Sequence, residues 1–124
     1  MKIEVIYEDN HLLAVNKPAG ILVQGDRTGD VSLVDFAKEY IKEKYQKPGK
    51  VFLGLVHRLD RPVSGVVVMA RTSKALTRMS DLFKRREVDK IYWALVSDSL
   101  PMEAGELVHW LRKDKQKNRV NLTS

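Results

Sequence analysis

The sequence predicts an α+β domain, in which two helices pack on a mixed, mainly antiparallel sheet. Apolar residues near the N-terminus recur with a period of two, which is typical of half-buried strands, whereas two later segments have helical spacing. At 124 residues the chain is the size of one domain and can bury a single core. No internal repeat or linker divides the sequence, so one domain is predicted over residues 1–124.

Strands are predicted at residues 2–8 and 11–16, and the short polar turn between them predicts a hairpin. A helix is predicted from Leu33 to about Tyr45, with apolar residues on one face and charged residues on the other. Ser32 is expected to be its N-cap, and Asp35, three residues later, completes a variant of the capping box.

The apolar residues 51–56 lead into a charged loop at residues 57–65, which is followed by a predicted strand at residues 66–70. A second helix is predicted from its N-cap Ser73 to about Arg86. The stripe that this helix is expected to bury comprises Leu76, Met79, Leu82 and Phe83. The remaining strands are predicted at residues 88–96, 105–111 and 119–122.

Composition limits the classes of function. Lys and Arg total 22 against 16 Asp and Glu, and the net charge of +6 is compatible with a polyanionic partner without requiring one. The absence of cysteine excludes disulfides, thiolate zinc sites and a cysteine nucleophile. The three histidines lack metal-ligand spacing. Neither a signal peptide nor an apolar run of the ~20 residues that span a bilayer is found, so we expect a cytoplasmic protein.

The charged loop, His57 to Gly65, contains the most informative residues of the chain. It places one carboxylate, Asp60, between the guanidinium groups of Arg58 and Arg61. Nearby opposite charge favours the ionised form of a carboxyl group. An ionised carboxylate suits a nucleophile better than a general acid. The alternative is a surface ion pair between aspartate and arginine at a turn.

This loop, His57-Arg58-Leu59-Asp60-Arg61-Pro62-Val63-Ser64-Gly65, resembles the catalytic loop of the RluA-type pseudouridine synthases, His-Arg-Leu-Asp-x-x-Thr-Ser-Gly. Three further stretches resemble motifs of that family, in the same order. They are Asn16-Lys17-Pro18-Ala19-Gly20, Arg71-Thr72-Ser73-Lys74-Ala75-Leu76 and Lys90-Ile91-Tyr92-Trp93-Ala94-Leu95-Val96. The resemblance extends from about Ile3 to about Val96.

The resemblance implies an enzyme that isomerises uridine to pseudouridine in structured RNA, ribosomal or transfer, without a cofactor or metal. Asp60 matches the catalytic aspartate of the family, and whether it attacks the base or the ribose stays open. Tyr92 matches a tyrosine that stacks against the extruded uracil and assists proton transfer; the alternative is a core aromatic. Arg58 matches an arginine that fills the space left by the base, or it pairs with Asp60.

Further contacts to RNA are expected from basic residues near the loop. Lys17, Arg61 and Lys90 are predicted to contact phosphates, which position RNA without reading its sequence. His57 is predicted to belong to the same RNA-binding set. A solvated surface charge is the alternative for each lysine or arginine. The cluster Lys84-Arg85-Arg86 either complements the dipole of its helix or contacts phosphate.

Two departures from the family pattern have consequences. Val63 stands where a threonine is usual, so one hydroxyl is lost. A later motif, near Gly-Arg-Thr-His-Gln-Ile-Arg, has no counterpart, so the resemblance covers only the N-terminal portion of a catalytic domain, without an S4-type module before it. The alternative function is therefore a catalytically incomplete RNA-binding fragment. Exposed sheet edges of such a fragment could pair with another chain. The particular RNA, the uridine and the oligomeric state are not predicted.

Overall fold

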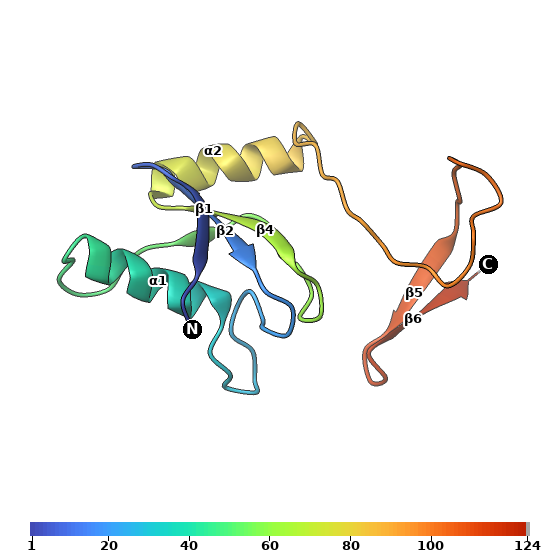
Figure 1. Cartoon of the computed structure of the whole chain (residues 1–124), viewed down its shortest axis with the longest axis horizontal. Helices are drawn as coiled ribbons and strands as arrows, with labels where there is room; N and C mark the ends of the chain where they lie inside the picture. The colour runs from blue at the N-terminus through green and yellow to red at the C-terminus, as the bar shows by residue number, and fades with distance from the viewer. Residues whose placement is uncertain (124) are drawn as a thin grey trace. The chain divides into compact units, whose positions relative to one another are not determined.

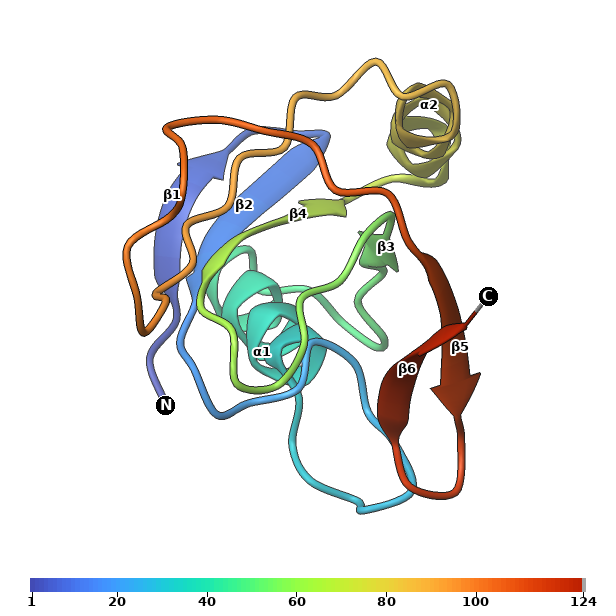
Figure 2. The same ribbon diagram turned by 90° about the vertical axis from the view of Figure 1, so that its right-hand side faces the viewer.

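Four strands form the main sheet of this protein (Figure 1), in the spatial order β1-β2-β4-β3, which Figure 2 labels in full. The computed structural model describes residues 1–123. The strands are β1 Glu4–Glu8, β2 Leu12–Lys17, β3 Gly54–Leu55 and β4 Gly65–Ala70, and every pairing among them is antiparallel. The predicted hairpin, the predicted strand after the charged loop and the α+β class are confirmed.

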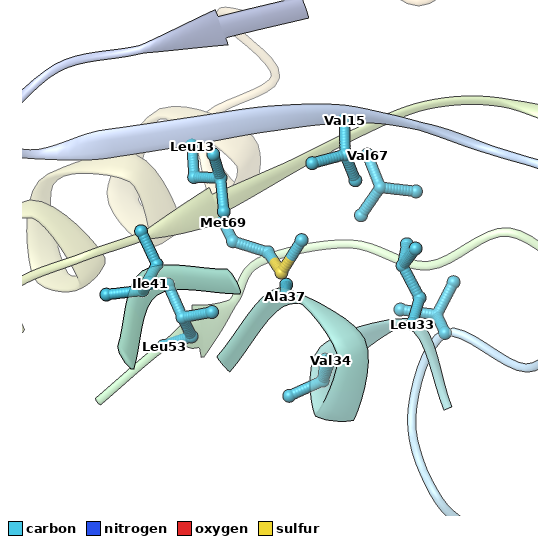
Figure 3. Packing of buried hydrophobic residues seen from close by; sticks show 10 residues of the cluster. Leu13, Val15, Leu33, Val34, Ala37, Ile41, Leu53, Val67 and Met69 are labelled. Atoms are coloured by element: carbon cyan, nitrogen blue, oxygen red, sulfur yellow. The ribbon is translucent and has the colours of Figure 1, made fainter. Parts of the chain in front are cut away.

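Helix α1, Leu33–Lys44, covers one face of this sheet (Figure 2). Its N-cap is Ser32, as predicted. The Ser32 hydroxyl accepts a hydrogen bond from the Asp35 N–H, and the Asp35 carboxylate accepts one from the Ser32 N–H at 2.9 Å. Apolar side chains from β2, β4 and α1 meet between the helix and the sheet and form the core (Figure 3). Its buried members are Leu13, Val15, Val23, Leu33, Val34, Ala37, Ile41, Leu53, Val67 and Met69.

Helix α2, Ser73–Lys84, packs against β4 and β3 on the face of the sheet opposite α1 (Figure 2). This close packing explains the glycine at position 54, because a Cβ there would lie 2.7 Å from the Leu76 side chain. Only Ala75 of this helix is buried. The predicted stripe of Leu76, Met79, Leu82 and Phe83 is half-buried, because α2 covers only the end of the sheet formed by β4 and β3.

The ends of α2 differ from the prediction. Thr72 is the N-cap instead of Ser73, because its hydroxyl accepts a hydrogen bond from the Ala75 N–H at 3.1 Å. The helix ends at Lys84, two residues earlier than predicted, and Arg86 has a positive φ of 57°. Both shifts arise because several adjacent residues have cap-forming or helix-compatible side chains, and backbone geometry selects among them.

The strand predicted at residues 88–96 is not formed. A strand exists only where its backbone N–H and C=O groups find a neighbouring strand. No segment of the described chain pairs with these residues. The alternating apolar side chains that predicted the strand are present but open to solvent, with Ile91 85%, Trp93 98% and Leu95 102% exposed.

The chain from Ile91 onward is a compact unit separate from residues 1–90. It contains an antiparallel hairpin of β5, Trp110–Asp114, and β6, Arg119–Thr123. The predicted charged turn between these strands is confirmed. The first strand begins at Trp110 rather than at residue 105, because Trp110 already lies opposite Thr123, the last residue of its partner strand.

A polar cluster around Glu8 ties the end of β1 to α1. The Glu8 carboxylate accepts hydrogen bonds from the hydroxyls of Tyr40, at 2.5 Å, and Tyr45, and from the Lys44 ammonium at 3.1 Å. The Arg71 guanidinium lies 3.9 Å away. Burial alone would raise the pKa of Glu8, but the hydrogen bonds from these partners outweigh burial and hold the pKa below its ordinary value.

A Glu8→Gln substitution is expected to lower the free energy of unfolding by about 1–2 kcal/mol at neutral pH, because Tyr40, Tyr45 and Lys44 lose a charged and largely buried acceptor. A carboxyl whose pKa is lower in the folded chain stabilises fully above its unfolded pKa and progressively less as pH falls through its folded pKa. The difference from wild type should therefore shrink as pH falls below about 5 and through the lowered pKa of Glu8 in the folded chain. Urea unfolding followed by helical circular dichroism measures it, since both helices lie in residues 1–90.

Glu39→Gln on the exposed face of α1 is the control and should cost less than about 0.5 kcal/mol. Equal losses for the two variants would contradict the prediction. So would a difference between wild type and Glu8→Gln that does not shrink as the pH falls below about 5.

Candidate active site

Asp60 lies in the loop between β3 and β4, and its carboxylate is exposed. The Val63 N–H donates to the Asp60 carbonyl oxygen at 2.9 Å and closes a turn around Pro62. On the inner side of the loop, Leu59 packs against the hydrophobic core. The backbone of the loop is thus fixed while the carboxylate remains accessible to a substrate.

The motif at residues 16–20, which begins at the end of β2, forms hydrogen bonds that hold the loop of Asp60 in place. Lys17 is fully buried, and its ammonium donates to the carbonyl oxygens of Pro18 at 3.0 Å, Ile21 at 2.7 Å and Arg61 at 3.0 Å. The Gly20 N–H donates to the same Arg61 carbonyl at 2.8 Å. These bonds join the motif at residues 16–20 to the charged loop at residues 57–65. Lys17 and Arg61, the residues that they connect, are more than 40 positions apart in the sequence.

The phosphate contact predicted for Lys17 does not fit this geometry. An ammonium group has three donors, and all three are used by carbonyl oxygens inside the protein. Burial holds the pKa of Lys17 below its usual range; the charge of Arg61 acts in the same direction, and that of Asp60 opposes both. Lys17 is a buried cross-link between two loops, a role that the spacing of the motif could not reveal.

The expected pairing of Asp60 with its flanking arginines is also corrected. Arg61 forms its ion pair with Asp30, at 2.6 Å between guanidinium and carboxylate, and Asp60 has no ion-pair partner in the described chain. Arg58 is exposed. The hydrogen bond from Arg61 is the main reason that the pKa of Asp30 is below its ordinary value. Sequence reasoning missed Asp30, because its Gly-containing segment indicates only a polar loop.

His57 lies at the start of the loop and points back toward the sheet. Its Nε2 accepts a hydrogen bond from the Val68 N–H at 2.9 Å, so this nitrogen is not available to RNA. Lys90, which is exposed, contributes its positive charge to the surroundings of the ring. Arg58 and His57 also line a hollow of about 460 Å³, together with Lys38 of α1.

Tyr92 belongs to the unit that begins at Ile91, is 62% exposed and lies outside any strand. Its predicted place beside the extruded uracil therefore stays a prediction. Among residues 1–123, no three histidine, aspartate or glutamate side chains gather in a way that could hold a metal ion. In the same part of the chain, no helix is long and apolar enough to cross a membrane.

Comparison with known proteins identifies the family to which the chain is related. A family model described as RNA pseudouridylate synthase matches residues 11–123. The chain belongs to this family. The family resemblance inferred from the sequence is therefore confirmed.

The most similar RNA pseudouridylate synthases include bacterial enzymes named for two kinds of RNA. The chain is 33% identical over 115 residues to "Ribosomal large subunit pseudouridine synthase C" of Buchnera aphidicola subsp. Schizaphis graminum, covering 93% of this chain and 35% of the relative. It is 35% identical over 112 residues to "tRNA pseudouridine synthase C" of Haemophilus ducreyi, covering 90% of this chain and 44% of the relative. The chain thus spans less than half of the length of these two relatives.

A solved structure of the family supports the fold. The structure of "Human RNA Pseudouridylate Synthase Domain Containing 4" superposes with a TM-score of 0.57 at 27% identity. The superposition covers 68% of this chain and 30% of the human chain. The sheet and helices described above are therefore those of a pseudouridylate synthase domain.

Proposed function

We propose that this chain provides the part of an RNA pseudouridine synthase catalytic domain that holds the catalytic carboxylate, Asp60. The reaction breaks the bond between uracil N1 and the ribose, and then joins the ribose to uracil C5, from which a proton is lost. Such chemistry requires the uridine to leave its stack and enter the site. The substrate is a uridine in structured RNA, ribosomal or transfer, and the cytoplasmic location expected from the sequence is part of the same proposal.

The observation that supports this proposal best is the presentation of Asp60. Its loop is held by hydrogen bonds from the buried Lys17 and from Gly20 to the Arg61 carbonyl, yet its own carboxylate is exposed and free of ion pairs within residues 1–123. A structural aspartate on a surface loop usually bonds its own backbone or a neighbouring cation, as Asp30 does with Arg61. A carboxylate that reacts with a substrate must be held in place by its loop and must not already be paired with a cation.

The electrostatics of the chain suit an RNA partner. The net charge is +6, and exposed cations, Arg58 and Lys90, belong to the loop and the segment that follow the family pattern. Lys90 is therefore proposed to contact phosphate, Arg58 to fill the space left by the extruded base, and Tyr92 to stack on the target base. Arg85 is less suited to a phosphate contact, because it already pairs with Asp81 at 3.0 Å and with Glu87 at 3.1 Å.

A second function, RNA binding without turnover, is favoured by one observation. The segment at residues 88–96, which includes Tyr92, has no partner strand in the described chain, so nothing there fixes the tyrosine beside a substrate. Binding by phosphate neutralisation should weaken steeply and log-linearly with salt for either function. RNA affinity that is indifferent to salt would contradict both.

Tritium release from RNA labelled at uridine C5 tests the proposed activity, because C5 loses its hydrogen only when the new bond to ribose forms. The full 124-residue chain is incubated with labelled ribosomal and transfer RNA, and Asp60→Ala is the control. Release that requires Asp60 supports the enzyme. A folded chain that binds RNA with a steep salt dependence and releases no tritium supports the second function instead.

A further inference from the structure

The shortest strand of the sheet ends beside the loop that contains Asp60. β3 has two residues, and Gly54 and Leu55 lie opposite Ala70 and Met69 of β4. Continued for one more residue, this register would place residue 56 opposite Val68. The chain instead leaves the sheet there, and the Val68 N–H donates to the imidazole Nε2 of His57 at 2.9 Å. A side chain thus replaces the next backbone acceptor of the ladder.

The chemistry of this hydrogen bond fixes the state of the ring. Because a backbone N–H can only donate, Nε2 must have a free lone pair, so the ring is neutral and its proton is on Nδ1. The ring is half-buried and stacks on Phe83 of α2, with centroids 5.1 Å apart and an interplanar angle of 19°. The imidazole is therefore held from two sides, by β4 and by α2.

Two anchors consequently hold the loop on either side of Asp60. His57 bonds to β4 three residues before it, and the carbonyl of Arg61 accepts hydrogen bonds from Lys17 and Gly20 immediately after it. We propose that His57 is a positioning residue, whose neutral imidazole substitutes for a missing residue of β3 and holds the Asp60 loop in place. The catalytic role of Asp60 rests on the proposed function, but the anchoring of the loop by His57 does not depend on it.

The surroundings of the ring make the anchor sensitive to acid. Two cations, Arg58 and Lys38, line the same hollow as His57, and the positive charge of Lys90 also acts on the ring. Burial, with a smaller effect of Lys90, holds the pKa of His57 below its ordinary value. The anchor is therefore intact at neutral pH and opens as pH falls through that lowered pKa, when protonated Nε2 can no longer accept.

Amide hydrogen exchange and ring ¹⁵N shifts of the full chain test the anchor without relying on turnover. The ¹⁵N shifts should show a protonated Nδ1 and an acceptor Nε2. After correction for intrinsic rates, protection of the Val68 amide and of amides 58–64 should fall as the ring is titrated with acid. His57→Gln, whose amide oxygen reaches a similar distance without titrating, should keep protection across this range. His57→Leu should show a protection that does not change with pH and is roughly tenfold below that of the wild type at neutral pH.

His11→Gln, at an exposed histidine, is the matched control and should behave as the wild type. A proton on Nε2 at neutral pH would overturn the proposal. So would unchanged loop protection in a folded His57→Leu variant, or an acid response that His57→Gln retains. A chain that releases no tritium would refute the proposed activity but leave these exchange results decisive. In a chain that does release tritium, the rate should decline on the acid side in wild type and not in His57→Gln.

Discussion

An Asp60→Asn variant is expected to bind RNA about as tightly as the wild-type chain and to release tritium at least about 1000-fold more slowly. Asparagine has the shape of aspartate but cannot act as a carboxylate nucleophile or base. The Asp60 side chain forms no ion pair within the described residues and is exposed, so the loop should keep its structure. Single-turnover release and fluorescence anisotropy with the same RNA measure the two effects separately.

Asp89→Asn, at another exposed aspartate, is the control for the loss of one negative charge. It should leave both rate and affinity within about twofold of wild type, because a single solvated charge interacts weakly through water. Release by Asp60→Asn within about tenfold of the wild-type rate would show that another group does the chemistry. Equal losses of affinity and rate would instead indicate that Asp60 acts in binding.

A Lys17→Met variant is expected to be destabilised by about 3 kcal/mol. Each hydrogen bond from a charged group contributes about 1.5–3 kcal/mol. Part of their loss is offset, because methionine does not require a charge to be taken out of water. Methionine fills a similar volume, but the carbonyls of Pro18 and Ile21 lose the bonds that Lys17 donates. The Arg61 carbonyl retains the bond from Gly20. Urea unfolding followed by helical circular dichroism measures the change in the unit that contains both helices.

Lys74→Met on the exposed surface of α2 is the same chemical change without buried partners and should shift stability by less than about 0.5 kcal/mol. Lys17→Arg separates charge from geometry, because a planar guanidinium cannot direct three donors as an ammonium does. It should recover little of the lost stability. Wild-type stability in Lys17→Met, or full recovery in Lys17→Arg, would contradict the cross-link.

Features that depend on neighbouring residues were predictable from the sequence. The capping box of Ser32 and Asp35, the hairpin of β1 and β2, and the charged turn before β6 each use bonds between residues close in the chain. Local chemistry also placed Asp60 in an exposed loop ahead of a buried strand. The run of residues in that loop is specific enough to indicate the family by itself.

Features that depend on distant partners were not predictable. The alternation at residues 88–96 has the period of a strand, but periodicity reports only which side chains are apolar and not whether a partner strand exists. Charge adjacency suggested that Arg61 would pair with Asp60, whereas folding places Asp30 within 2.6 Å of it. Adjacent residues in a loop often point apart, so sequence neighbours are poor guides to ion pairs.

The sequence by itself thus determined most of the elements, the family and the exposed carboxylate at position 60, because each follows from local periodicity, local hydrogen bonding or an extended run of matching residues. Only the tertiary structure decided what holds that carboxylate in place. Lys17 and His57 were both predicted to bind RNA. In the structure the Lys17 ammonium is buried among carbonyl oxygens, and the His57 imidazole accepts a hydrogen bond from the backbone of β4. The physical reason is that a polar side chain satisfies whichever partner folding brings within reach, and burial makes that partner obligatory.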